Sequence, residues 1–174
     1  MGQLTLILGD AYSGKSDFAK QLFPESARVL FIATLQPAND EVKQQIAKIR
    51  ADRPPLWSSI EAPLQVPQVL QHCGFQYDGF IVDSITHYMW NLLAKVGRER
   101  TDDQLMIEVG RTIGAAQIAD APVAVVSGQI AGGVASSDPN ARRYQELVSR
   151  ANRKLLDAAD NVYELSAGKE VKLK

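Results

Sequence analysis

The 174-residue sequence predicts an α/β fold built on a mostly parallel β-sheet. Four short, continuously apolar runs alternate with segments of helical periodicity, at residues 3–8, 28–34, 80–83 and 122–127. Continuous apolar runs are typical of parallel strands whose two faces are both covered by helices. A glycine-rich turn follows the first run directly and opens a helix. Because no linker or shift in composition divides the chain, we expect one domain spanning residues 1–174.

In the N-terminal half, three helices are expected at residues 16–23, 40–50 and 66–72, with a short strand at 57–60. Pro24 stops the first helix. Asp40 is expected to cap the second helix, whose residues Val42, Ile46 and Ile49 share one face. These signals predict helices that alternate with strands along the chain.

In the C-terminal half, three further helices are expected at residues 85–95, 101–118 and 140–159. Thr101 and Gln104 have the spacing of a capping box at the start of the middle one. A loop rich in glycine and serine, residues 128–139, precedes the last helix. Residues 161–165 and 170–173 flank Ala167-Gly168 and predict a C-terminal hairpin.

The composition argues against several classes of protein. The chain is 45% hydrophobic and 22% charged with a net charge of −1, which disfavours disorder and bulk nucleic-acid binding. One cysteine, Cys73, and two histidines, His72 and His87, argue against a disulfide framework and a Cys- or His-based metal centre. The apolar runs fall far short of the roughly 20 residues that span a bilayer, and the start lacks a basic leader. We therefore expect a soluble cytoplasmic protein without membrane or nucleic-acid partners.

The strongest motif lies between the first strand and the first helix, where residues 9–16 match G-x-x-x-x-G-K-[ST] at every fixed position. In such a loop the glycines let the backbone approach phosphate oxygens, and successive amides point at the anion. Lys15 would reach the terminal phosphates, and the Ser16 hydroxyl would bind Mg²⁺. A nucleoside triphosphate, ATP or GTP, is therefore expected on the loop residues Gly9, Asp10, Ala11, Tyr12, Ser13, Gly14, Lys15 and Ser16.

A second metal-binding residue is expected at the end of another core strand. Asp83 closes the run at 80–83 and fits this role, with Ser16 as the other metal-binding side chain. The alternative is that Asp83 caps the helix that follows. Lys15 and Asp83 are thus the expected catalytic residues.

Short patterns spread along nearly the whole chain extend the motif: Ala33-Thr34, Asp40-Glu41, Arg53-Pro54, Trp57 with Glu61, and Asn91-Leu92. With them the chain resembles the bifunctional adenosylcobinamide kinase and adenosylcobinamide-phosphate guanylyltransferase family of cobalamin biosynthesis. The resemblance implies a RecA-like P-loop NTPase fold and a homotrimer. It also implies two reactions. ATP or GTP phosphorylates the aminopropanol hydroxyl of adenosylcobinamide, and GMP is then transferred from GTP through a guanylyl-histidine.

The chain departs from the family at the nucleophile. The family's H-[RK]-x-x-R-P segment here begins with Ile49, which has no nucleophilic atom, so the guanylyltransferase reaction is in doubt. Arg50 and Arg53 remain and are expected to bind a triphosphate or a substrate phosphate. His87, four residues after Asp83, is the one plausible replacement, although we favour a solvated or packed histidine. The kinase is therefore the main hypothesis, with a non-catalytic nucleotide- or corrinoid-binding paralogue, or a kinase of another small alcohol, as alternatives.

Other side chains have weaker claims to the site. Gln129 stands where the family has an acidic residue, and Asp138 in the same loop is a possible substitute. Arg142 or Arg143, near the start of the last helix, is a candidate phosphate contact. Aromatic side chains that would pack against a corrin or a base, or else in the core, are Trp57, Tyr88 and Trp90.

Overall fold

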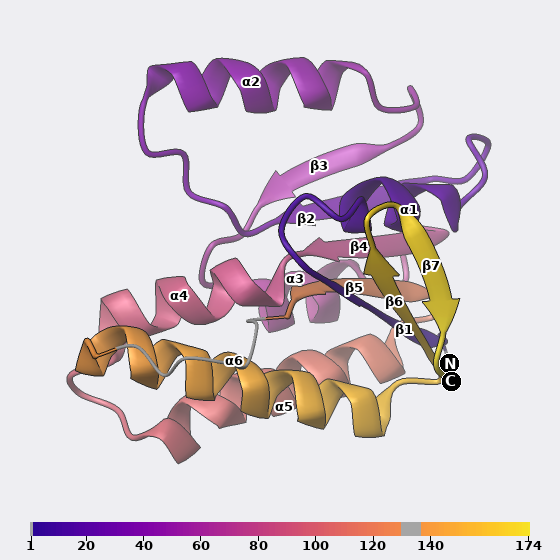
Figure 1. Ribbon diagram of the computed structural model, residues 1–174. Helices are drawn as coiled ribbons and strands as arrows, with labels where there is room; N and C mark the ends of the chain where they lie inside the picture. The colour runs from indigo at the N-terminus through magenta and orange to yellow at the C-terminus, as the bar shows by residue number, and fades with distance from the viewer. Residues whose placement is uncertain (1, 130–136) are drawn as a thin grey trace.

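The computed structural model describes residues 2–129 and 137–174, and its centre is a seven-stranded sheet in the order β3-β2-β4-β5-β1-β6-β7 (Figure 1). Strands β1 to β6 run parallel, and β7 pairs antiparallel with β6. The predicted mostly parallel sheet and the C-terminal hairpin are both confirmed. The strands are β1 Leu4–Gly9, β2 Val29–Ala33, β3 Ser58–Glu61, β4 Gly79–Asp83, β5 Val123–Gly128, β6 Asn161–Ser166 and β7 Lys169–Lys172.

Helices cover the sheet unequally. The helices are α1 Lys15–Gln21, α2 Asp40–Ala51, α3 Val66–Cys73, α4 Ile85–Val96, α5 Asp102–Ile118 and α6 Pro139–Ala158. Helices α3 to α6 form a layer on one face, whereas α1 packs on the other (Figure 1). Helix α2 projects beyond the β3 edge of the sheet (Figure 1). Among the described residues, no helix is long and apolar enough to cross a membrane.

Strand β1 shows why its sequence is mostly apolar. Leu4, Leu6 and Leu8 point into the large core beneath α3 to α6, and Ile7 points into the smaller core with Phe18 of α1. Side chains alternate between the two faces of a strand, so a strand covered on both faces has no solvent-facing position to fill with polar residues. The two-sided burial predicted from the sequence is confirmed.

The helix starts show which capping predictions succeeded. The side chain of Thr101 accepts a hydrogen bond from the Gln104 backbone, and Gln104 returns one to the Thr101 backbone, so the predicted capping box is confirmed. The prediction that Asp40 caps α2 was wrong. Asn39 has the extended backbone of an N-cap and its side chain accepts a hydrogen bond from the Val42 amide, so Asp40 becomes the first helical residue.

Helix α2 is amphipathic but uncovered. None of the twelve residues that the structure describes in α2 is buried, and Ile49 is 51% exposed. Its apolar stripe therefore faces open space between the helix and the sheet.

Candidate functional site

The loop between β1 and α1 has backbone geometry that its glycines allow. Gly14 has φ 90°, in the left-handed region that favours glycine, and Tyr12 also lies there with φ 59°. A methyl group added at Gly9 would lie 2.5 Å from Ser13 Oγ and 2.6 Å from the Leu165 carbonyl oxygen. The loop is thus packed too closely at Gly9 for any larger residue.

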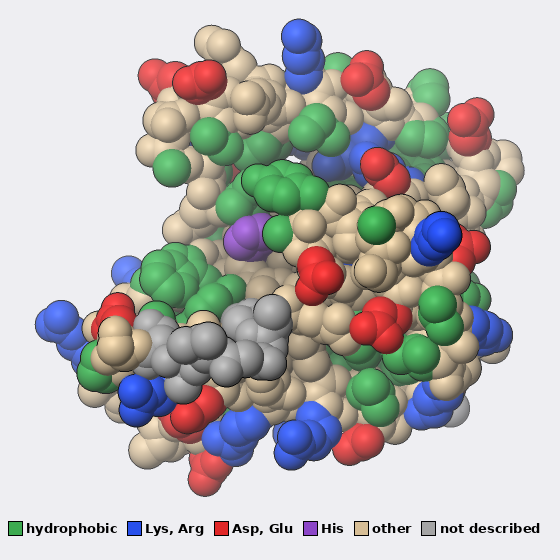
Figure 2. Space-filling view, in the orientation of Figure 1, with side chains coloured by type: hydrophobic (Ala, Val, Ile, Leu, Met, Phe, Trp, Pro, Cys, Tyr) green, Lys and Arg blue, Asp and Glu red, His purple; other side chains and the backbone are tan. Residues whose placement is uncertain are grey.

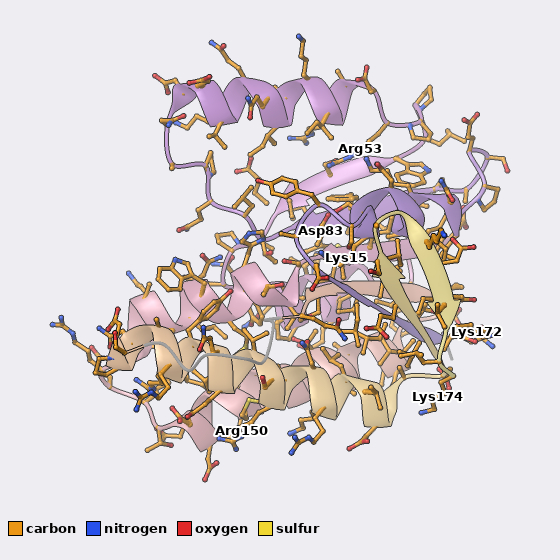
Figure 3. All side chains as sticks on the ribbon, viewed as in Figure 1. Lys15, Arg53, Asp83, Arg150, Lys172 and Lys174 are labelled. Carbon is orange, nitrogen blue, oxygen red and sulfur yellow. The ribbon has the colours of Figure 1, made fainter. Side chains whose placement is uncertain are left out.

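Three polar side chains meet where β1 and β4 end. Ser16 Oγ donates a 2.6 Å hydrogen bond to Asp83 Oδ2, although the two residues are 67 positions apart. The Lys15 ammonium donates to the Asp10 carbonyl within the loop. Burial lowers the pKa of Lys15, against the opposing attraction of the Asp83 and Asp10 carboxylates. The loop, the cation and the carboxylate therefore share one edge of the sheet, as Figure 3 shows for Lys15 and Asp83.

This pair of oxygen ligands suits a magnesium ion. Mg²⁺ prefers hard oxygen ligands and is usually held by one or two protein groups together with phosphates and water. Ser16 supplies a hydroxyl and Asp83 a carboxylate that is already directed at that hydroxyl. The residues present therefore fit the metal that the motif predicts.

The alternative role for Asp83, as the cap of α4, is excluded. Ser84 is the N-cap, with an extended backbone and a side chain that accepts a hydrogen bond from the His87 amide. The Asp83 carboxylate is consequently available to the site.

Two cavities open beside these groups. The first, which we call the loop cavity, has a volume of about 820 Å³. It is lined by residues Ala11 to Asp17 and by Thr86, Gln129 and Tyr144. The second, the α2 cavity, is about 660 Å³ and lies between the loop and α2. Figure 2 shows the molecule hollowed between α2 and the helices below it. Side chains lining the α2 cavity include Phe31, Ile46, Ile49, Arg50, Arg53 and Glu61.

Both predicted arginines lie at the α2 cavity. Arg50 donates to the Ser59 carbonyl at 3.0 Å, and Arg53 donates to Ser59 Oγ at 2.6 Å. The Arg53 guanidinium stacks 3.6 Å from the centre of the Phe31 ring and points toward Asp83 (Figure 3). Burial lowers the pKa of Arg53, although the Asp83 carboxylate pulls it the other way. Its Nε atom is buried without a hydrogen-bond partner among the described residues.

A polar network that the sequence reasoning missed supports the site from behind. Thr34 Oγ1 donates to the Ser84 carbonyl and accepts from the Ser84 amide, both at 2.7 Å. Asn91 donates to the Thr34 carbonyl at 2.8 Å, and Thr86 Oγ1 accepts from the Gly128 amide at 2.8 Å. The available signal was a cluster of hydroxyl residues directly after two apolar runs, where parallel strands end at one edge.

Other candidates lie elsewhere or serve other contacts. Arg143 bonds Asp102 at 2.7 Å and the Arg100 carbonyl at 2.8 Å, so it ties α6 to the start of α5. Asp138 is the N-cap of α6, and neither Asp138 nor Arg142 is among the described residues lining the two cavities. Gln129 does line the loop cavity, and its backbone N–H donates a hydrogen bond to the Gly9 carbonyl. Residues 130–136 of the glycine- and serine-rich loop lie outside the described residues.

The aromatic candidates divide between core and surface. Tyr88 is fully buried and donates to Glu108, and Trp57 packs at the smaller core. Trp90 is exposed and stands edge-on to Tyr144, with ring centres 5.2 Å apart. The core alternative is therefore correct for Tyr88.

Comparison with known proteins adds to this geometry. A family model described as cobinamide kinase / cobinamide phosphate guanyltransferase matches residues 5–173. The chain belongs to this family. It is 28% identical over 180 residues to the bifunctional adenosylcobalamin biosynthesis protein CobU of Escherichia coli K12, covering 98% of this chain and 99% of that protein.

Two solved structures share the fold of this chain. An ATPase of a bacterial type III secretion system matches with TM-score 0.58 and 13% identity, over 95% of this chain and 52% of that one. A KaiC-like protein of Pyrococcus horikoshii matches with TM-score 0.57 and 12% identity, over 99% and 79%. The predicted P-loop, RecA-like fold class is confirmed.

Proposed function

We propose that this member of the cobinamide kinase / cobinamide phosphate guanyltransferase family transfers the terminal phosphoryl group of ATP or GTP to the aminopropanol hydroxyl of adenosylcobinamide. The observation that carries the proposal is the meeting of two cavities at Ser16 and Asp83. A triphosphate on the loop would direct its terminal phosphate to this junction. An acceptor alcohol in the α2 cavity would reach the same point from the other side.

The chain's own residues would act mainly by position and charge, as phosphoryl transfer requires. The loop amides from Gly9 to Ser16 would hold the phosphates, and Lys15 would offset charge that develops on the transferred group. Ser16 and Asp83 would hold Mg²⁺, which when bound neutralises charge on the phosphate oxygens. Arg50 and Arg53 would bind a phosphate or another anion from the α2 side.

The covalent guanylyl transfer would not run through position 49. Ile49 lines the α2 cavity, so the position is near the site, but its side chain cannot form a phosphoramidate. This departure supports a second candidate, a paralogue that binds a nucleotide or corrinoid without turnover. The Lys15, Ser16 and Asp83 set favours turnover, because binding alone would not require the metal-holding pair. A kinase that uses another small alcohol would share the same residues.

The deciding experiment is a phosphoryl-transfer assay with adenosylcobinamide, Mg²⁺ and either ATP or GTP. We expect Lys15→Ala to lower turnover by about 100-fold or more, because it removes a cation that stabilises the transition state. Lys169→Ala, on the exposed C-terminal hairpin, is the control and should match the wild type. Wild-type turnover no higher than that of Lys15→Ala, with any corrinoid, would instead support the binding paralogue.

The family resemblance also favours a homotrimer, and the composition favours the cytoplasm. Sedimentation velocity of the full chain would test the trimer directly.

A further inference from the structure

His87 stands at the junction of the two cavities, in the first turn of α4. Side chains that line both the loop cavity and the α2 cavity are Tyr12, Ser16, Asp17, Leu35, Asp83 and His87. A group at this junction can contact a phosphate bound to the loop and an acceptor bound on the α2 side. Since Asp83 is directed at Ser16, His87 is the nitrogen base available there.

The hydrogen bonds of His87 determine which ring nitrogen is free. The Ser84 hydroxyl directs its only hydrogen at Thr86 Oγ1, 3.2 Å away. Ser84 Oγ also lies 3.0 Å from His87 Nδ1. We assign the hydrogen of this second contact to Nδ1, because a Ser84 hydroxyl that donates to Thr86 has no second hydrogen to give to the ring. Nε2 then has an unshared electron pair, and no described residue forms a hydrogen bond with it.

The surroundings favour the neutral form of this ring. Burial lowers the pKa of His87, and the nearby Lys15 cation lowers it further, while the Asp83 carboxylate opposes both. A neutral imidazole with a free Nε2 can accept a proton, whereas an imidazolium cannot.

We propose that His87 is the general base of the phosphoryl transfer, and that its Nε2 accepts the proton of the acceptor hydroxyl. This inference rests on the function proposed above. In the step, the acceptor oxygen bonds to the terminal phosphorus as the bridging P–O bond breaks. The nucleoside diphosphate leaves with that electron pair, and the proton stays on Nε2 until the imidazolium releases it to water. Protein kinases give the same task to an aspartate that accepts the proton of the substrate hydroxyl.

The first test needs no turnover. Nitrogen-15 NMR of the histidine rings in the nucleotide-free protein reports which nitrogen carries the hydrogen. The chain has only two histidines, and His72→Gln leaves the signals of His87 alone. We expect the Nδ1–H form in that variant, and its loss when Ser84→Ala is added. A ring protonated at Nε2 would overturn the proposal.

The second test measures the chemical step. His87→Gln keeps a polar side chain that cannot take up the proton, so we expect kcat to fall by about 100-fold or more while nucleotide affinity is unchanged. His72→Gln, on the exposed face of α3, is the matched control and should retain the wild-type kcat. Imidazole in solution should restore activity to His87→Gly but not to Lys15→Ala. A kcat within about tenfold of wild type, an equal loss of nucleotide affinity, or absence of rescue would each overturn the proposal.

Two outcomes separate the proposed function from the role of His87. If the wild type phosphorylates no alcohol, the proposed function and this role for His87 fall together. If the wild type is active and His87→Gln is equally active, only the role of His87 falls.

Discussion

At the scale of single residues, the site depends on the contact between Ser16 and Asp83. A hydroxyl and a carboxylate 2.6 Å apart form a strong hydrogen bond, and the same two oxygens can turn to a shared cation. The pair is assembled by tertiary structure, since Ser16 begins α1 and Asp83 ends β4. At position 83, only a side chain of similar length and charge would keep both the hydrogen bond to Ser16 and the ability to hold a cation.

Asp83→Asn tests this pair. The amide keeps the size of the side chain but removes the negative charge, so we expect Mg²⁺ to support turnover about 10- to 100-fold less well. Titrating Mg²⁺ into EDTA-treated protein, with turnover as the readout, would measure the change. Asp157→Asn, an exposed carboxylate on α6, is the control. An unchanged Mg²⁺ dependence in Asp83→Asn would exclude this metal role.

At the scale of elements, the start of α4 is the best supported part of the site. Thr34 after β2, Ser84 before α4 and Asn91 within α4 join three elements through buried hydrogen bonds. Buried polar groups with satisfied partners hold one geometry, because breaking any bond leaves a desolvated group unpaired. By contrast, Arg50 of α2 and Arg53 just after it form hydrogen bonds to Ser59 of β3. The start of α4 is thus held by buried hydrogen bonds, whereas α2 is more weakly attached to the sheet.

The capping box of α5 offers a measurement at this scale. Thr101→Ala removes the side-chain acceptor for the Gln104 amide and should cost about 1 kcal/mol of unfolding free energy. Urea denaturation followed by circular dichroism would measure the loss. Ser149→Ala, at an exposed interior position of α6, should change stability by less than about 0.5 kcal/mol. Equal stabilities for the two variants would mean that this cap contributes nothing to α5.

At the scale of the whole molecule, both cavities lie at the edge where the parallel strands end. Open α/β sheets commonly bind ligands at this edge, where loops from several strands converge. The family resemblance predicts a nucleophilic histidine on α2, and this chain has Ile49 there, facing the α2 cavity. We therefore propose that the molecule catalyses phosphoryl transfer without the covalent guanylyl step.

Labelling with GTP carrying ³²P at the α-phosphate tests this statement. We expect no covalent label on the protein, because Ile49 has no atom that can form a phosphoramidate. Denaturing gel electrophoresis before and after acid treatment is the measurement, with the curated Escherichia coli relative as the comparison protein. Stable label that acid releases would contradict the prediction and point to His87 as the nucleophile.

Local patterns in the sequence predicted much of this molecule. The alternation of apolar runs and helices predicted the sheet, and Thr101 with Gln104 predicted a real cap, because these signals act between near neighbours. The cap of α2 was misassigned between adjacent residues Asn39 and Asp40, both of which suit that position. Arg143 was misread because its partners lie more than forty positions away.

The sequence by itself determined the phosphate loop, since a turn that needs glycine at Gly9 and Gly14 is specified by adjacent residues. It also determined the family to which the chain belongs. Only the tertiary structure decided that Ser84 caps α4 and leaves Asp83 for Ser16, and that His87 faces both cavities. The physical reason is that these contacts join segments up to 67 positions apart, which meet only where the parallel strands end together.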